Sequence, residues 1–152
     1  QCYATHYVEN SKSDAWFEGV AEMLQTLKAE GIKLAVATGK SRKGLDRVLS
    51  QTQSHALFVV TRAASETKSK PDPLMLAEIL YITGVNAENA IMVGDTSYDL
   101  EMAQNIAMPR IGVSYGVHTP ETLAQYKPIA IAEDVASLHQ LLLNQVNLKQ
   151  AV

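Results

Sequence analysis

The chain has 152 residues, of which 47% are apolar and 19% charged, and its formal net charge is −3. This length is typical of one domain, and the high apolar share excludes a disordered chain. The weak negative charge argues against a nucleic-acid or membrane surface, and the single cysteine, Cys2, excludes an internal disulfide framework. No apolar run reaches the roughly 18 residues needed to cross a bilayer, and no secretory pattern opens the chain, so a cytoplasmic protein is expected.

Four short apolar runs predict buried strands, at residues 33–38, 57–61, 90–95 and 110–114. The runs are continuous rather than alternating, which is typical of strands covered on both faces. Helical patterns lie between them, and an alternation of strands and helices favours a parallel sheet between two helical layers. The sequence therefore predicts the α/β class, with a three-layer α/β/α Rossmann-like core and a mostly parallel sheet.

Capping residues and apolar spacing predict the helices of this core. Proline is favoured in the first turn of a helix, and glycine just past its end. The segment 144–152 is expected to be a loosely held tail. The predicted helix limits are Gly31 and Gly84 as stops, and Ser41, Asp72 with Pro73, Asp95, Pro120 and Asp134 as starts.

Polar residues that follow the first strand suggest a phosphate site. The strand at 33–38 ends in Thr38 and Gly39, and the next helix begins with the cations Arg42 and Lys43. Cations oppose the helix dipole at this end, and a bound phosphate would resolve that conflict. In open α/β sheets, ligands bind at the carboxyl ends of the strands, where Thr38 lies. A solvated basic corner is the alternative interpretation.

Two carboxylates follow the strand at 90–95 and suggest a metal site. Asp95 ends the strand, and Asp99 lies four residues later in the first turn of a helix. Oxygen ligands in small number suit Mg²⁺, and Gly94 allows close approach of the backbone to a ligand. The alternative is that Asp99 only complements the helix dipole. Lys70 is a third candidate, because prolines at positions 71 and 73 stiffen the backbone that presents it.

Taken together, these segments resemble motifs two, three and four of the haloacid-dehalogenase-like phosphatase superfamily, most closely its phosphoglycolate-phosphatase-like branch. The segments are Ala-Thr-Gly-Lys at residues 37–40, Lys-Pro-Asp-Pro at 70–73 and Gly-Asp-Thr-x-x-Asp at 94–99. The resemblance implies a phosphatase core over residues 19–143, with residues 1–18 as a remnant of the helical cap and of its connection to the core.

The resemblance implies Mg²⁺-dependent hydrolysis of a small phosphorylated metabolite through an aspartyl-phosphate. Thr38 and Gly39 would bind the phosphoryl group, and Lys70 would stabilise both the nucleophilic carboxylate and the transferring group. Asp95 would ligate Mg²⁺, and Asp99 would ligate the ion or orient its water. These roles agree with the physical needs of phosphoryl transfer, which are positioning and compensation of charge on oxygen.

The family's first motif, Asp-x-Asp-Gly-Thr, is absent from this sequence. No two of its six aspartates are separated by a single residue. The nucleophile and the general acid/base of the family therefore have no counterpart here, and we expect this chain alone to be inactive as a phosphatase. Most of the cap, which sets substrate choice in the family, is also expected to be missing.

The missing motif also implies a missing strand in the centre of the sheet, between the strands at 33–38 and 90–95. Its loss would leave unpaired backbone groups on two apolar edges. We expect one of three outcomes: the two strands close up, residues 1–8 fill the gap, or a second chain supplies a strand by exchange or dimerisation. The missing part could also belong to the molecule outside the sequence given.

Two other functions compete with a phosphatase. Residues 112–116 match the G-x-S-x-G pattern of serine hydrolases, with Ser114 as nucleophile and Asp134 and His139 following in the expected order. That elbow needs a helix directly after the serine, whereas Pro120 marks the next helix start. The other alternative is a phosphate-binding module that keeps the pocket and performs no chemistry.

Overall fold

A computed structural model describes residues 19–150 of the chain, with side chains to residue 146. The predicted remnant at residues 1–18 lies outside this range. The strands are β1 (Ala35–Thr38), β2 (Val60–Ala63), β3 (Met92–Gly94), β4 (Arg110–Val113) and β5 (Ala130–Ala132). The helices are α1 (Val20–Ala29), α2 (Arg42–Gln51), α3 (Leu74–Thr83), α4 (Ser97–Gln104), α5 (Pro120–Ala124) and α6 (Val135–Gln150). Short 3₁₀ turns are η1 (His55–Leu57), η2 (Ala64–Glu66) and η3 (Ala87–Asn89).

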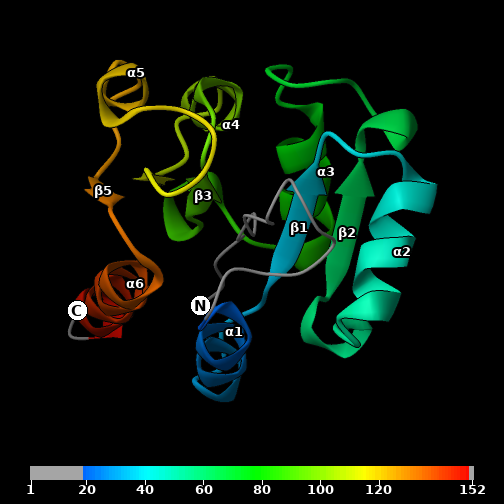
Figure 1. Cartoon of the computed structure of the whole chain (residues 1–152), viewed down its shortest axis with the longest axis horizontal. Helices are drawn as coiled ribbons and strands as arrows, with labels where there is room; N and C mark the ends of the chain where they lie inside the picture. The colour runs from blue at the N-terminus through cyan, green and yellow to red at the C-terminus, as the bar shows by residue number, and fades with distance from the viewer. Residues whose placement is uncertain (1–18, 151–152) are drawn as a thin grey trace.

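The strands form two parallel sheets rather than one (Figure 1). β1 pairs with β2 from Ala35↔Val60 to Thr38↔Ala63. β4 lies between β3 and β5 in the second sheet. Within residues 19–150, no ladder joins β1 to β3, so these two strands have not closed up. The α/β class and the interruption at the predicted central strand are confirmed.

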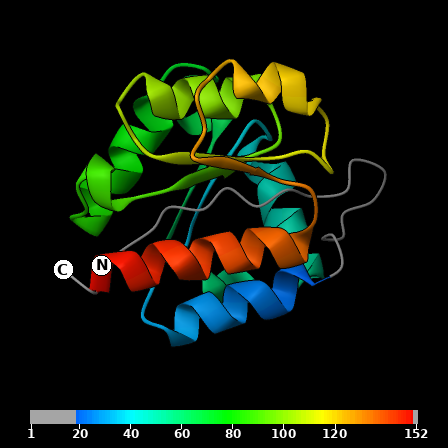
Figure 2. The ribbon, with the colours of Figure 1, turned by 90° about the vertical axis from the view of Figure 1, so that its left-hand side faces the viewer.

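Helices cover both faces of the strands, so the core has three layers. Figure 2 shows α1 and α6 on one side of the strands and α4 and α5 on the other. One apolar cluster combines α1, α2 and α6 with alternate strand residues such as Val36 and Val93. The second combines α3 and α4 with Ala37 and Met92. Because both clusters contain residues of β1 and β3, side-chain packing holds the two sheets together without shared backbone hydrogen bonds.

Several element limits differ from the prediction. The strand predicted at 57–61 begins later, at Val60, because η1 occupies its first residue. β5 was not predicted. The loose tail predicted from residue 144 is wrong, since α6 continues to Gln150 and Val146, at 4% exposure, is buried in the core. The predicted cap Asp134 is correct: its carboxylate accepts a hydrogen bond from the Ser137 N–H at 2.7 Å.

Helix α3 shows how local sequence positions the site. Leu74 N–H donates to the Asp72 side chain at 3.0 Å, and Gly84 ends the helix with a left-handed φ of 71°. The backbone from residue 70 to the start of α3 is therefore fixed by Asp72 and the two prolines. No helix within residues 19–150 has both the length and the apolar character needed to span a bilayer.

Candidate active site

A pocket of about 360 Å³ opens at the carboxyl ends of β1 and β3. Three stretches of chain form its walls: the end of β1, the segment from η2 to Lys70, and the turn from β3 into α4. All five predicted site residues line this pocket, although their roles stay predictions. The lining residues are Thr38, Gly39, Ala64, Ser69, Lys70, Asp95, Thr96, Tyr98 and Asp99.

The wall from β1 can approach a ligand closely. Thr38 is 8% exposed, and its hydroxyl accepts a hydrogen bond from the Lys40 N–H at 3.1 Å. This bond turns the backbone back on itself directly after the strand. Gly39 is exposed, and a Cβ added to it would meet nothing within 4 Å. A group the size of a phosphate therefore has room beside the Thr38 hydroxyl.

Lys70 and Asp99 form an ion pair across the pocket between Lys70 Nζ and Asp99 Oδ1. The side chains are 12% and 1% exposed, so the pair is largely shielded from water. Asp99 Oδ2 accepts hydrogen bonds from the hydroxyl and the N–H of Thr96, at 2.9 and 3.3 Å. A Cβ on Gly94 would overlap the Asp99 side chain, so glycine is required where β3 meets α4. These contacts hold the Lys70 ammonium at the pocket.

A loop after β4 holds Asp95, and the sequence did not predict this contact. Val117 N–H donates to Asp95 Oδ2 at 3.0 Å, and His118 N–H donates to the Asp95 carbonyl at 3.0 Å. A Cβ on Gly116 would overlap the Asp95 side chain. His118 Nδ1 accepts a hydrogen bond from the Ser97 N–H at 2.9 Å, which satisfies a free amide at the start of α4. The loop thus fixes both Asp95 and the helix that follows it.

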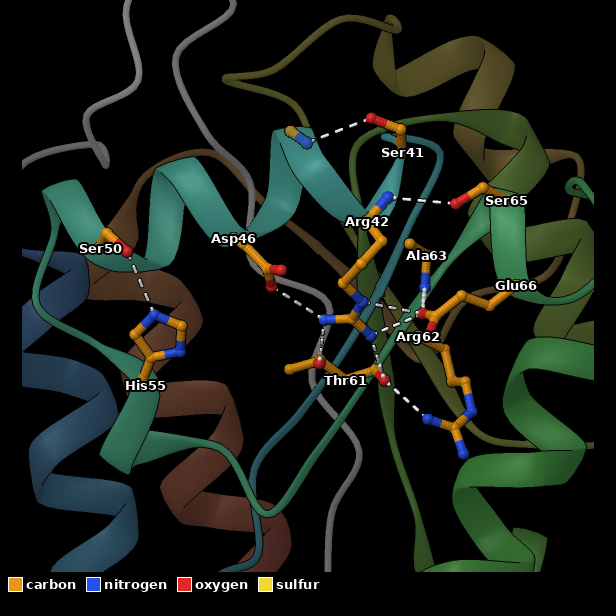
Figure 3. Close-up of polar contacts among 11 residues, drawn as sticks. Ser41, Arg42, Asp46, Ser50, His55, Thr61, Arg62, Ala63, Ser65 and Glu66 are labelled. Carbon is orange, nitrogen blue, oxygen red and sulfur yellow. Dashed lines mark hydrogen bonds and ion pairs between the residues drawn. The ribbon is translucent and has the colours of Figure 1, made fainter.

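The cations at the start of α2 do not line the pocket, so of the two interpretations left open by the sequence the structure does not support a phosphate site built from them. Arg42 lies along the outside of β2, where its guanidinium contacts Glu66, Asp46 and Thr61 (Figure 3). The hydrogen bond to Glu66 raises the pKa of Arg42, and the same bond lowers the pKa of Glu66. Lys43 lines a separate hollow along α2. Lys70 is therefore the cation among the residues that line the pocket.

The structure does not give Ser114 the geometry of a nucleophile. Ser114 follows β4, and its hydroxyl donates to the Ala132 carbonyl at 3.3 Å. The next helix, α5, begins only at Pro120. His139 Nε2 is buried and has no hydrogen-bond partner within the described part of the chain. The alternative of a serine hydrolase therefore has no triad to support it.

The carboxylates suit a partial metal site. Within residues 19–150, no group of three His, Cys, Asp or Glu side chains could hold a metal ion. Asp95 Oδ1 accepts no hydrogen bond from the described residues, whereas both oxygens of Asp99 are engaged with Lys70 and Thr96. Mg²⁺ is commonly held by one or two carboxylates, with waters and phosphate oxygens completing its shell. Asp95 fits such an ion better than Asp99 does.

This chain is similar to known hydrolases in sequence and in fold. A family model described as "Haloacid dehalogenase-like hydrolase" matches residues 1–113. The "Probable phosphatase IndB" of Dickeya dadantii is 37% identical over 131 residues, covering 83% of this chain and 57% of that protein. The "Phosphoglycolate phosphatase" of Psychrobacter arcticus is 31% identical over 128 residues, covering 84% and 56%. A crystal structure of a predicted phosphatase from Clostridium acetobutylicum superposes with a TM-score of 0.79 at 26% identity, covering 86% of this chain and 61% of that one. The chain thus spans little more than half of these curated relatives.

Proposed function

This chain belongs to the haloacid dehalogenase-like hydrolase family, and we propose that its pocket binds the phosphoryl group of a small phosphorylated metabolite for Mg²⁺-dependent hydrolysis. The observation that carries the proposal is that Thr38, Lys70 and Asp95, from three distant stretches of the chain, line one pocket. A hydroxyl, an ammonium group and a carboxylate around one hollow can bind a dianion beside a divalent cation.

Each pocket residue would have a role that follows from the chemistry of its side chain. The Thr38 hydroxyl and the open backbone at Gly39 would bind phosphoryl oxygens. The Lys70 ammonium would offset negative charge on the transferring group, with Asp99 as the residue that positions it. Asp95 would hold Mg²⁺, which when bound supplies positive charge to the phosphoryl oxygens. Phosphoglycolate enters here only through the name of the family branch. The pocket residues would recognise the phosphoryl group, which every phosphate ester carries.

We propose that this chain alone binds phosphate without turning over an ester. The Asp-x-Asp-Gly-Thr motif, which the family resemblance assigns to the nucleophile, is absent from the sequence given. None of the aspartates that line the pocket has a second aspartate two residues away. For the same reason a phosphate-binding module without chemistry remains the second candidate, and it predicts the same binding for the complete protein with no hydrolysis.

We also propose that an added strand between β1 and β3 completes the sheet, by exchange or dimerisation with a second chain. Every residue of β1 and β3 is buried, yet each strand has hydrogen-bond partners on one side only within the described residues. Buried backbone groups without partners are costly, which favours pairing with another segment. Light scattering over a range of protein concentrations tests this: a chain that stays monomeric throughout excludes completion by a second copy.

Titration calorimetry with inorganic phosphate in the presence of Mg²⁺ tests the function itself. We expect binding that weakens in Thr38→Val and Lys70→Met, whereas Lys43→Met keeps wild-type affinity because Lys43 lies outside the pocket. A parallel assay with p-nitrophenyl phosphate should show no turnover by this chain. Wild-type protein that binds no phosphate, or Lys43→Met that weakens binding as much as Lys70→Met, contradicts the proposal.

A further inference from the structure

Side chains bond to the backbone at the outer edge of β2, among them those of Arg42 and Glu66. Among residues 19–150, β2 pairs with β1 alone, and the Thr61 carbonyl and the Ala63 N–H bond to side chains instead of to a strand. Arg42 Nη2 donates to the Thr61 carbonyl at 3.0 Å, and Glu66 Oε1 accepts from the Ala63 N–H at 3.0 Å. Arg42 and Glu66 also bind each other, with Nη2–Oε1 at 2.6 Å and Nε–Oε1 at 3.1 Å (Figure 3).

This arrangement imitates a neighbouring parallel strand. In a parallel ladder, the carbonyl of residue i and the N–H of residue i+2 bond to the same residue of the next strand. Thr61 and Ala63 stand in that relation, and the Arg42–Glu66 pair supplies one donor and one acceptor to them. The pair therefore provides partners for the Thr61 carbonyl and the Ala63 N–H at the end of β2, and Arg62 Nη1 also donates to the Thr61 carbonyl at 2.9 Å.

The same pair joins two walls of the pocket. Arg42 is the first residue of α2, three positions after Gly39, and Glu66 ends the 3₁₀ turn that leads to Lys70. Two further hydrogen bonds join the same two segments. Arg42 N–H donates to the Ser65 hydroxyl at 3.1 Å, and Ala64 N–H donates to the Lys40 carbonyl at 3.1 Å. The wall of Thr38 and Gly39 is thus tied to the segment that carries Lys70.

We propose that Arg42 and Glu66 form a positioning pair, which fixes the segment 64–70 against the start of α2 and so holds Lys70 at the pocket. The inference rests on the proposed function only for its effect on phosphate binding. On its far side the segment is anchored by the Lys70–Asp99 ion pair and by the Asn105 amide, which donates to the Pro71 carbonyl at 3.3 Å. On its other side, towards the start of α2, the segment is held by the ion pair between Arg42 and Glu66.

The guanidinium is required for this role, rather than positive charge alone. Arg42 donates at once to Glu66, to Asp46 and to both the hydroxyl and the carbonyl of Thr61. A lysine ammonium is a single point and cannot reach all these acceptors. Arg42→Lys therefore separates a positioning role from a simple charge effect.

A second ion pair on the same strand provides the matched control. Arg62 Nε contacts Glu78 Oε2 at 3.1 Å, and Glu78 is 35% exposed against 36% for Glu66. Glu78 lies in α3. Its ion pair with Arg62 involves neither the segment 64–70 nor the start of α2. Truncating Glu78 to alanine removes a similar ion pair but leaves Arg62, which also donates to the Thr61 carbonyl at 2.9 Å, and leaves every contact of Arg42 and Glu66 in place.

The test combines amide hydrogen exchange with the affinity for inorganic phosphate, in wild type, Glu66→Ala, Arg42→Lys and Glu78→Ala. For Glu66→Ala and Arg42→Lys we expect faster exchange confined to residues 63–70, and phosphate affinity reduced by about 2- to 30-fold, the range of coupling through positioning residues. Glu78→Ala should keep both the local exchange and the affinity within about twofold of wild type.

Each result decides the question. If Glu66→Ala matches Glu78→Ala in both readouts, or if exchange rises equally throughout the chain, the pair only contributes general stability and the inference is wrong. If Arg42→Lys behaves as wild type, charge alone suffices and the guanidinium argument is wrong. If wild type binds no phosphate, the proposed function fails, while the exchange data still decide whether the pair fixes the segment.

Discussion

Replacing Lys70 by methionine removes the ammonium group that faces the Asp99 carboxylate and keeps a side chain of similar length. Asp99 is 1% exposed and Lys70 12%, so the carboxylate would stay buried beside an apolar neighbour. Removing one partner of a buried ion pair costs about 3–5 kcal/mol. Thr96 keeps its two hydrogen bonds to Asp99, and Lys70 is partly solvated, so we expect a loss near the lower limit, about 3 kcal/mol.

Urea unfolding followed by far-ultraviolet circular dichroism measures this loss. For a chain of this length, about 3 kcal/mol corresponds to a fall in Tm of roughly 6–12 °C. Removing both charges in Lys70→Met with Asp99→Asn should recover most of the loss, because no unpaired charge then remains buried. Arg62→Met breaks a more exposed ion pair and should cost about 1 kcal/mol or less. A Lys70→Met protein within about 0.5 kcal/mol of wild type would refute the reasoning, since that is the effect of a surface substitution.

Three further predictions concern the loop after β4. Gly116→Ala places a Cβ on the Asp95 side chain and should cost about 1–3 kcal/mol in urea unfolding, whereas Gly39→Ala, with open space around it, should stay within about 0.5 kcal/mol. Burial, and secondarily the charges of two nearby aspartates, raise the pKa of Tyr115. The folded state then holds this proton longer than the unfolded chain, so stability is full below pH about 10 and falls above it, and Tyr115→Phe should make that alkaline fall shallower. A fluorophosphonate should leave Ser114 unlabelled, and labelling detected by mass spectrometry would revive a serine hydrolase.

The strands that could be predicted from the sequence are those whose local pattern matches their environment. The runs at 33–38, 90–95 and 110–114 are long, continuous and apolar, and they became β1, β3 and β4. β5 was missed because Ala130–Ala132 is only three residues long and contains two alanines, which have low strand propensity. Its strand character depends on pairing with β4 rather than on its own residues.

The end of α6 was mispredicted for a different reason. Leu138, Leu142 and Val146 follow one another at four-residue spacing, and all three are buried. This stripe continues past residue 143, so the sequence did carry the signal for a longer helix. The prediction stopped early because the residues after 143 are mostly polar, which is also the pattern of an exposed helix face.

The candidate site also has some features that the sequence predicted and others that it could not predict. The rule that strand ends meet at one edge predicted that Thr38 and Asp95 would share a pocket, and the stiff segment around Lys70 predicted a lysine aimed at a site. The support of Asp95 by Gly116 could not be predicted, because the two residues lie 21 positions apart and only the fold brings them together. The sequence left two interpretations of Arg42 open, because a place in the first helical turn does not decide which way a long side chain lies.

The division of the strands into two sheets has a consequence for the width of the pocket. Thr38 belongs to one half of the molecule and Asp95 to the other, and no backbone ladder among the described residues bridges the seam between them. Sliding or spreading of the halves would strain the apolar packing, the Lys70–Asp99 contact and the hydrogen bond from the Asn105 amide to the Pro71 carbonyl, which both span the seam. A polypeptide segment inserted between β1 and β3 would therefore set the distance between the two halves, and with it the width of the pocket.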